Sequence, residues 1–309
     1  PVVYPAPDLS FISPPAKSAG TGAFTLTATG TSFVNGAIVR LNGADRSTTF
    51  VNATQLTAQI TAADIQTAGV LAVTVFNPGP GGGLSGSVNL TVNNPLPSVT
   101  TLSPSSVTAG AAAFTLTVNG ANFVNGSAVK LNGSNRPTNF VSSTQVTADL
   151  SAADVATAGT VPVTVENSAP GGGVSNAVNL AVSNPTPALT SLLPASANVG
   201  GAAFTLTVNG SGFVSGSVVK FAGSNRTTAF VDNTKVTASI LAADIQSTGN
   251  FAITVFNPAP GGGTSGALDL AVVNPVPNLI SVSPTSKAVG AAAFTLTATG
   301  TSFVNGAIV

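Results

Sequence analysis

The chain contains no cysteine, methionine, histidine or tryptophan, and only one of its 309 residues is tyrosine. Without cysteine there is no disulfide framework and no thiol nucleophile. Without histidine the chain lacks the side chain most often used as a general base and metal ligand. The near absence of tyrosine and tryptophan also disfavours a carbohydrate site, which usually presents an exposed ring of one of these two residues. The sequence therefore predicts no enzyme, no catalytic residue and no cofactor.

Charge is scarce as well. Lysine and arginine number nine, aspartate and glutamate also nine, and together they make up 6% of the residues, against about 25% in ordinary soluble domains. A net charge of zero without a basic cluster argues against nucleic acid as a partner. The acids are dispersed and lack the spacing of a calcium loop, so no metal site is expected. A surface with so little charge favours association.

Long apolar runs are missing too, although 43% of the residues are hydrophobic. No stretch approaches the roughly 18 apolar residues of a transmembrane helix, so no membrane-spanning segment is expected. The apolar residues are instead spread among alanine, valine, threonine and serine in a regular pattern. This distribution is typical of small folded domains rather than of a disordered chain.

What the chain does have is a period of ninety residues without an insertion or deletion. Phe24 recurs at positions 114, 204 and 294, and the dipeptide Asn94-Pro95 recurs at positions 184 and 274. A fixed period of this length indicates an array of small domains. We expect the end of a preceding unit at 1–3, complete units at 4–93, 94–183 and 184–273, and an incomplete fourth unit at 274–309.

The fourth unit is a copy of the first. Residues 293–309 are identical to residues 23–39, whereas the second unit differs at several of these positions. This identity predicts a higher-order block of three units. The large apolar side chains Phe294, Leu296 and Phe303 lack an opposing sheet within this sequence. We expect the polypeptide to continue past Val309, with swapped or lateral packing of the fourth unit as the alternative.

Within one unit, the pattern predicts short strands separated by turns. Residues 24–27 alternate between apolar and polar side chains, the period of a half-buried strand. Asn42-Gly43 is a strong turn pair, and the glycine-rich tract 78–83 predicts a hairpin near the end of the unit rather than a phosphate loop, because no helix follows it. Further strands are expected at residues 9–12, 38–41, 48–51, 55–60, 71–76 and 88–92.

A single helical signal follows the strand 55–60. Thr61 with Asp64, and Ser151 with Asp154, have the spacing of a capping box, in which the acid accepts a hydrogen bond from the backbone of the capping residue. The third unit has Leu241 at the capping position, so only a turn is expected there. The predicted fold class is all-β, a series of immunoglobulin-like β-sandwiches. The expected core of the first unit consists of Phe24, Leu26, Phe33, Val39, Leu41, Phe50, Leu56, Ile60, Val73, Val75, Leu90 and Val92.

Two motifs resemble a known family. The run G-x-x-x-F-T-L-T-V-x-G-x-x-F at residues 110–123 resembles the start of an IPT/TIG domain, and V-T-V-x-N-x-x-P-G-G-G-x-S at residues 163–175 resembles its end. The resemblance covers every complete unit. It implies an immunoglobulin-like sandwich, and bacterial members are commonly strung in tandem on extracellular proteins. Members that contact DNA do so through basic loops, which this chain lacks.

One arginine and one aspartate recur in each unit and are the most prominent polar positions of so neutral a chain. They suit either a surface ion pair combined with a helix cap, or a pair that binds a ligand or bridges two units. The first interpretation is favoured, because surface ion pairs are common and contribute little stability. The candidate residues are Arg46, Asp64, Arg136, Asp154, Arg226 and Asp244.

The junctions between units have the form x-N-P-x-P and contain no flexible spacer. Proline fixes its own φ and restricts the residue before it to extended geometry, so the sequence predicts a rod-like or helical array of units. We expect a structural protein: a repeat segment of a filament, stalk or sheath that self-associates on a bacterial cell surface or outside the cell. The alternatives are an adhesin stalk or binding module that contacts other cell-surface proteins, and a passive spacer in a larger secreted enzyme.

Overall fold

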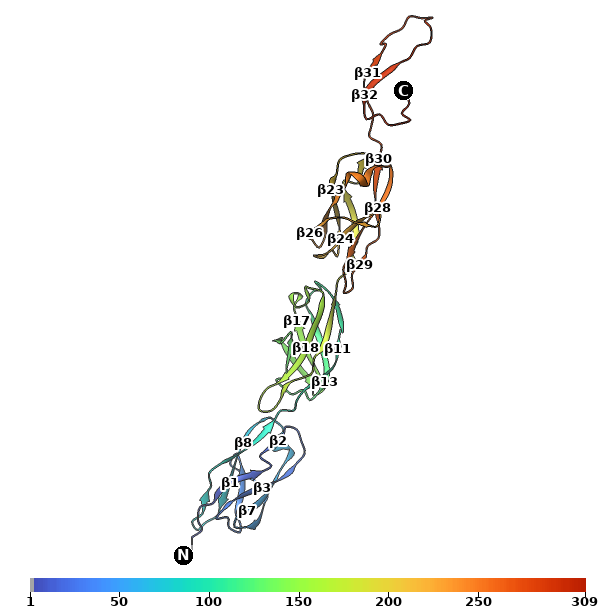
Figure 1. Cartoon of the computed structure of the whole chain (residues 1–309). Helices are drawn as coiled ribbons and strands as arrows, with labels where there is room; N and C mark the ends of the chain where they lie inside the picture. The colour runs from blue at the N-terminus through green and yellow to red at the C-terminus, as the bar shows by residue number, and fades with distance from the viewer. Residues whose placement is uncertain (1–2) are drawn as a thin grey trace. The chain divides into compact units, whose positions relative to one another are not determined.

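Residues 3–309 are described by a computed structural model, in which three β-sandwiches follow one another along the chain and a two-stranded sheet comes after the third (Figure 1). Residues 1 and 2, which belong to the predicted end of a preceding unit, lie outside the described part. Each sandwich corresponds to one complete repeat of the sequence. The prediction of tandem all-β, immunoglobulin-like sandwiches is confirmed.

The first repeat consists of ten strands and one 3-10 turn. Their bounds are β1 Asp8–Ser13, β2 Ala16–Ser18, β3 Phe24–Thr31, β4 Ile38–Leu41, β5 Ala44–Asp45, β6 Thr48–Asn52, β7 Gln55–Ile60, η1 Ala62–Ile65, β8 Gly69–Asn77, β9 Gly83–Leu84 and β10 Val88–Asn93.

The second and third repeats have the same elements in the same order. The second contains β11 Ser98–Ser103, β12 Ser106–Thr108, β13 Phe114–Ala121, β14 Ala128–Leu131, β15 Ser134–Asn135, β16 Thr138–Ser142, β17 Gln145–Leu150, η2 Ala152–Val155, β18 Gly159–Asn167, β19 Gly173–Val174 and β20 Val178–Ser183. The third contains β21 Ala188–Leu193, β22 Ser196–Asn198, β23 Phe204–Ser211, β24 Val218–Phe221, β25 Ser224–Asn225, β26 Thr228–Asp232, β27 Lys235–Ile240, η3 Ala242–Ile245, β28 Gly249–Asn257, β29 Gly263–Thr264 and β30 Leu268–Val273.

The two sheets of a repeat differ in size and in the order of their strands. In the first repeat the four-stranded sheet has the order β1-β3-β7-β6, and the six-stranded sheet has the order β2-β10-β8-β4-β5 with β9 beside β8. All pairings within the first repeat's sheets are antiparallel except that of β2 with β10, which is parallel. The three shortest strands, β2, β5 and β9, were not predicted, because two or three residues are too few to show a periodic pattern.

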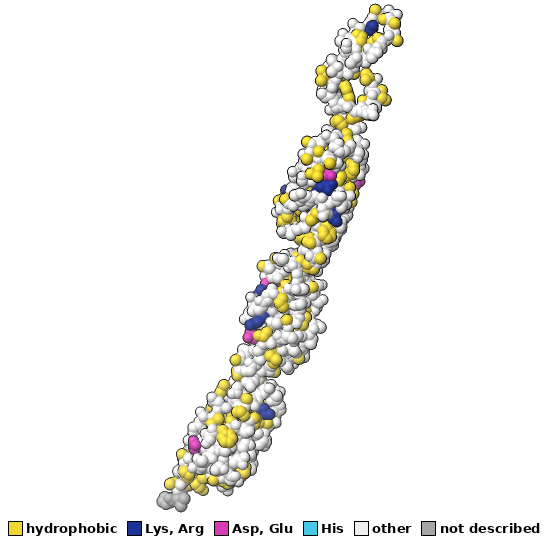
Figure 2. Space-filling model, viewed as in Figure 1, with side chains coloured by type: hydrophobic (Ala, Val, Ile, Leu, Met, Phe, Trp, Pro, Cys, Tyr) yellow, Lys and Arg dark blue, Asp and Glu magenta, His cyan; other side chains and the backbone are white. Residues whose placement is uncertain are grey.

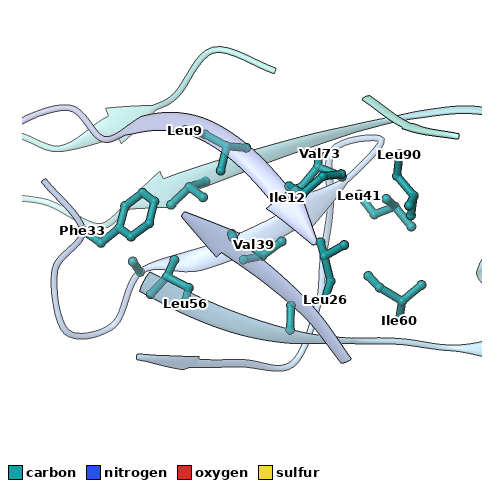
Figure 3. Close-up of a cluster of buried hydrophobic side chains, with 14 of the residues drawn as sticks. Leu9, Ile12, Leu26, Phe33, Val39, Leu41, Leu56, Ile60, Val73 and Leu90 are labelled. Atoms are coloured by element: carbon teal, nitrogen blue, oxygen red, sulfur yellow. The ribbon is translucent and has the colours of Figure 1, made fainter. Parts of the chain in front are cut away.

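The core lies between the two sheets and follows from the alternation along the strands. Leu26 on β3 and Val39 on β4 are fully buried, while the threonines beside Leu26 point away from the core and remain partly or fully accessible. Figure 3 shows such side chains from both sheets meeting in the first repeat. Burying each of the larger ones contributes about 1.5–3 kcal/mol.

Two predicted core residues occupy a different place. Phe24 and Phe50 are only partly buried and pack against the margin of the core, and the Lys17 ammonium lies 4.9 Å from the centre of the Phe24 ring. Phe24 begins β3, and Phe50 lies on β6 at the edge of its sheet, so neither ring has neighbours on all sides. The remaining ten predicted residues are buried. Leu9, Ile12 and Ile65 complete the core without having been predicted.

The predicted helical segment is one turn of 3-10 helix in every complete repeat, Leu241 notwithstanding. The backbone N–H of Thr61 donates to the Asp64 carboxylate at 2.9 Å, and the N–H of Leu241 donates to Asp244 at the same distance. A leucine has no polar side chain for the other half of a capping box. The bond from backbone to carboxylate is therefore enough to keep the turn.

The fourth, incomplete repeat forms one antiparallel sheet of two strands, β31 Asn278–Ser283 and β32 Thr297–Thr301. Leu296 and Phe303 are 43% and 45% exposed, whereas the identical positions of the first repeat, Leu26 and Phe33, are 0% and 3% exposed. The same sequence is therefore apolar surface in one place and core in the other.

Charged side chains are few and separated on the face shown in Figure 2, where uncharged polar and hydrophobic side chains fill most of the surface. Within residues 3–309, no helix has the length and apolar character needed to cross a membrane.

Candidate functional site: the linker clamp and the ion pair of each repeat

A glycine-rich loop holds the segment that leads into its own repeat. In the second repeat, Asn94 forms an isolated parallel bridge with Gly171. The backbone N–H of Asn94 donates to Pro170 O at 2.7 Å, and the N–H of Gly172 donates to Asn94 O at 2.7 Å. The Asn94 side chain also donates to Ser168 O at 2.7 Å. We call these bonds, together with that of Asn167 described below, the linker clamp.

The same clamp occurs in the other two complete repeats. Tyr4 pairs with Gly81 and Asn184 with Gly261, through backbone hydrogen bonds of 2.7–2.8 Å to the same loop positions. Asn184 also donates through its side chain, to Pro258 O at 2.9 Å. The predicted hairpin at this tract is present as the short pairing of β8 with β9, and its glycines additionally hold the linker.

A buried asparagine at the end of the long central strand completes the clamp. Asn167 is 1% exposed, and its side-chain amide donates to Pro95 O at 2.8 Å and to Asn122 O at 2.8 Å. Its oxygen accepts a hydrogen bond of 2.6 Å from Ser127 Oγ. One side chain therefore joins the linker to both ends of the loop between β13 and β14.

The first repeat lacks one of these bonds. Asn77 donates to Pro5 O and Ser32 O, at 3.0 and 2.6 Å, but Ala37 stands where the second repeat has Ser127. Asn77 Oδ1 is consequently buried without a hydrogen-bond partner among the described residues. A buried polar atom left unpaired costs about 1–3 kcal/mol.

Two glycines of the loop are required by close approach of the backbone. A Cβ added at Gly171 would lie 2.7 Å from Asn94 O, and one at Gly172 would lie 2.3 Å from Asn167 O. Both residues have positive φ, +68° and +65°. Any other residue here would strain the loop and collide with the backbone that the clamp holds.

At the first junction, between residues 93 and 94, no residue lies outside the backbone hydrogen bonds of the two repeats. Asn93 O accepts a hydrogen bond of 2.8 Å from Ala19 N of the first repeat, whereas Asn94 N donates to Pro170 of the second. Successive residues of the chain are therefore bonded to successive repeats. The sequence has no flexible spacer at this junction. The structure gives a reason, because the residues on both sides of the peptide bond between 93 and 94 are hydrogen-bonded to folded repeats.

The recurring arginine and aspartate lie together within each complete repeat. Arg46 donates through Nε and Nη2 to the two oxygens of Asp64, at 3.0 and 2.6 Å. Arg226 and Asp244 meet in the same fork at 2.8 and 2.5 Å, and Arg136 places both nitrogens on one oxygen of Asp154. Each of these pairs lies within a single repeat.

Each pair connects two of the places where the chain passes between the sheets. Arg46 lies between β5 of the six-stranded sheet and β6 of the four-stranded sheet, and Asp64 lies in the turn between β7 and β8. The arginine Nη1 also donates to the backbone oxygens of residues 44 and 45. The side chains are 18% and 14% exposed, so a two-bond, charge-assisted contact is partly shielded from water.

Hydrogen bonding lowers the pKa of two of these aspartates. The Arg136 guanidinium lowers the pKa of Asp154 below its usual value, against the opposing effect of burial and with help from Ser151. At Asp64 burial raises the pKa, but hydrogen bonds from Arg46 and from Thr61 together outweigh it, so the pKa is also lowered. Both carboxylates are thereby held ionised, which suits structural ion pairs better than proton transfer.

Another recurring cation lies on the six-stranded sheet. Arg40 stacks on Phe76 at 4.2 Å from the ring centre, and Lys220 lies 5.0 Å from the ring of Phe256. In the second repeat the aromatic position holds Glu166, which forms an ion pair with Lys130. Each repeat thus keeps a favourable partner for this cation on the neighbouring strand.

The geometry of all three sandwiches agrees with one sequence family, since IPT/TIG domains match residues 7–92, 97–182 and 187–272. The chain belongs to the IPT/TIG domain family. The resemblance predicted from the two motifs is confirmed. Tandem Ig-like repeats of this kind support a structural or adhesive role, and IPT/TIG domains are typically non-catalytic.

Comparison with curated proteins found no match. Among solved structures, the I9–I11 tandem of titin is 10% identical, with a TM-score of 0.31 and coverage of 88% of this chain and 98% of that one. A 1.5-MDa bacterial ice-binding adhesin is 16% identical, with a TM-score of 0.26 and coverage of 86% and 97%. The extracellular region of plexin A4 is 13% identical with a TM-score of 0.26; the match covers 87% of this chain and 34% of the plexin. The IPT/TIG array thus spans about a third of the plexin chain.

Among the described residues of this IPT/TIG array, no three aspartate or glutamate side chains gather where a metal ion could be held. Sequence reasoning found the ion pairs but missed Asn77, Asn167 and Asn257. The available signal was the asparagine of the V-T-V-x-N motif, which recurs every ninety residues. Nothing in the pattern indicates that this asparagine is buried and bonded to the linker.

Proposed function

We propose that this IPT/TIG array is a repeat segment of an extracellular structural protein, a filament, stalk or sheath on a bacterial cell surface that assembles by self-association. The observation that carries the proposal is the linker clamp, which is present in every complete repeat and leaves no free residue at the first junction. Because the linker is held by hydrogen bonds, it transmits force from one folded repeat to the next instead of extending under load.

The pairing of the second and last strands of a repeat suits the same role. β2 and β10 lie side by side and parallel, with Val92 paired to Lys17, and β22 and β30 pair in the same way. Tension along the chain pulls two such strands in opposite directions along their length. The hydrogen bonds between them are then loaded together rather than broken one at a time.

The composition supports self-association. With 6% charged residues and no net charge, two copies meet little electrostatic repulsion on close approach. Ten of the eighteen charged side chains are paired within a repeat among the described residues, six of them in the three recurring arginine–aspartate pairs. Few lysines and arginines also leave few sites for trypsin-like proteases, which suits a protein exposed outside the cell.

Electron microscopy of the native purified material tests this proposal. We expect ordered filaments or sheets whose axial repeat corresponds to one or three IPT/TIG units. Separate molecules that never associate at any concentration would contradict the filament. The array would then serve as a spacer or an adhesin stalk, whose binding activity resides in another domain.

A further inference from the structure

The edge strands of each sandwich are not equally protected. β1, at one edge of the four-stranded sheet, lies between Pro7 and Pro14 and carries a bulge between Leu9 and Phe11. The edges of the six-stranded sheet, β2 and β5, have only three and two residues. Prolines, bulges and short length are the devices by which natural proteins prevent pairing at an edge.

β6, at the other edge of the four-stranded sheet, has less protection. It spans five residues without a proline and pairs only with β7 among the described residues. Its bulge lies near its end, between Phe50 and Asn52, so that Thr48, Thr49 and Phe50 are in regular register with β7. β16 and β26 occupy the same edge in the second and third repeats, and of the three strands only β16 is directly preceded by a proline, Pro137.

The same edge exposes a valine in every complete repeat. Val51, Val141 and Val231 are 48%, 50% and 53% exposed. No other position of the repeat, within residues 3–309, keeps a large hydrophobic side chain exposed in all three complete copies. Valine strongly favours strands, and each of these valines lies at the bulge, next to the three residues in regular register.

Charged side chains do not protect this edge from pairing either. β6 and β16 contain no charged residue. β26 ends in Asp232, whose carboxylate accepts hydrogen bonds from the backbone and side chain of Thr234, at 2.8 and 2.6 Å. Lysine, the residue commonly used to block edge pairing, is absent from all three strands.

We propose that β6, β16 and β26 form a lateral assembly surface whose partner is a second copy of this chain. Two copies of one edge pair antiparallel about a two-fold axis, and two four-stranded sheets then become one continuous sheet. This inference rests on the self-association in the proposed function and identifies the surface responsible.

The ninety-residue repeat favours a second copy of this chain, rather than an unrelated protein, as the partner of this edge. Three regular residues per repeat give a weak contact alone. Another copy presents the same edge every ninety residues, with Asp232 as its one charged residue, so each of two chains offers three matching edges. Linked sites of this kind raise the overall affinity well beyond that of one site.

Sedimentation velocity of three full-length proteins tests the surface. They are the wild type, the edge variant V51K/V141K/V231K, and the control T25K/T115K/T205K. The control places the same three charges on exposed positions of β3, β13 and β23, which are central strands. Circular dichroism establishes that all three are folded. We expect the wild type and the control to associate alike and the edge variant to associate at least tenfold more weakly.

The outcomes separate the two proposals. An edge variant that associates like the wild type, or a control that loses association equally, overturns the edge surface while filaments in the microscope leave the proposed function intact. A wild type that stays monomeric and forms no filaments overturns both. A cysteine introduced as N139C on β16 gives a direct readout, since it would be the only cysteine and antiparallel pairing sets the second repeat against its own copy. Disulfide-linked dimers from N139C, with none from T115C, support antiparallel pairing at this edge.

Discussion

At the scale of single residues, the buried asparagine at the end of the central strand is the polar group on which most of the linker clamp depends. Asn167 satisfies its whole amide with Pro95, Asn122 and Ser127. Because the side chain is buried, water cannot replace a missing partner. The second and third repeats supply a serine hydroxyl to this asparagine and the first does not. The first repeat can therefore be compared with the other two within the same chain.

Replacing Ala37 by serine should stabilise the first repeat by about 1 kcal/mol, since the new hydroxyl would pair with Asn77 Oδ1. The reverse change, Ser127→Ala, should destabilise the second repeat by about 1–3 kcal/mol, because it leaves Asn167 Oδ1 unpaired. Native-state hydrogen exchange, followed by peptide, measures each repeat in the full chain. Unchanged exchange in the second repeat of S127A, or in the first repeat of A37S, would contradict this account.

The aspartate of the ion pair should make stability depend on pH. The pKa of Asp154 is lowered in the folded state, so its contribution is present above the ordinary carboxyl pKa of about 3.9. It is lost as the pH falls through the lowered value. Asp154→Asn should therefore destabilise the second repeat near neutral pH, by about 1–3 kcal/mol.

The difference between D154N and the wild type should shrink as the pH falls below about 4. Denaturant unfolding as a function of pH measures it. Asp8→Asn is the matched control, because Asp8 makes no hydrogen bond or ion pair through its side chain among the described residues and is exposed. A constant difference between D154N and the wild type down to pH 2 would show that the ion pair does not account for the loss.

At the scale of elements, the loop between β18 and β19 does more than reverse the chain. It is shaped by three glycines of positive φ, and it offers Pro170 O and Gly172 N to Asn94. Its conformation and the position of the linker are thus determined together. A change in the loop should be transmitted to the junction.

Gly172→Ala should destabilise the second repeat by about 1–3 kcal/mol, because it adds a clash with Asn167 O to the cost of positive φ. Gly110→Ala is the control: Gly110 has a φ of +76°, and nothing lies within 4 Å of its added Cβ. Hydrogen exchange at the amides of residues 94 and 172 should become faster in G172A than in G110A. Equal effects would mean that the loop tolerates the contact.

At the scale of the whole molecule, the scarcity of charge limits how copies of the chain could attract one another in the proposed assembly. Nine positive and nine negative side chains are spread over three repeats and part of a fourth, and within residues 3–309 five ion pairs use ten of them. In the proposed assembly, attraction between copies would therefore come mainly from apolar contacts and backbone pairing.

Self-association should accordingly change little with salt. Raising NaCl from about 50 to about 500 mM shortens the Debye length severalfold, yet the sedimentation profile should stay nearly the same. Ammonium sulfate should strengthen association, because it favours burial of apolar surface. A steep loss of association in NaCl would instead indicate assembly through charged side chains.

Much of the fold followed from local pattern. Strands such as 24–31 and 55–60 alternate clearly, and the ninety-residue period placed every copy in register. The pairing of Arg46 with Asp64 was expected because both recur in a chain almost without charge. The short strands β2, β5 and β9, and the marginal place of Phe24 and Phe50, depend on which neighbours a residue has in the folded sheet.

The sequence by itself determined the ninety-residue repeat, the all-β class and the family, because these follow from residue types and their spacing. Only the tertiary structure decided that Asn167 is buried, that the glycine loop holds the linker, and that β6 is the less protected edge. These features join residues more than forty positions apart or depend on what a strand lacks beside it. Hydrogen bonds between residues so far apart in the sequence cannot be read from a local pattern, because the packing of the two sheets decides which residues meet.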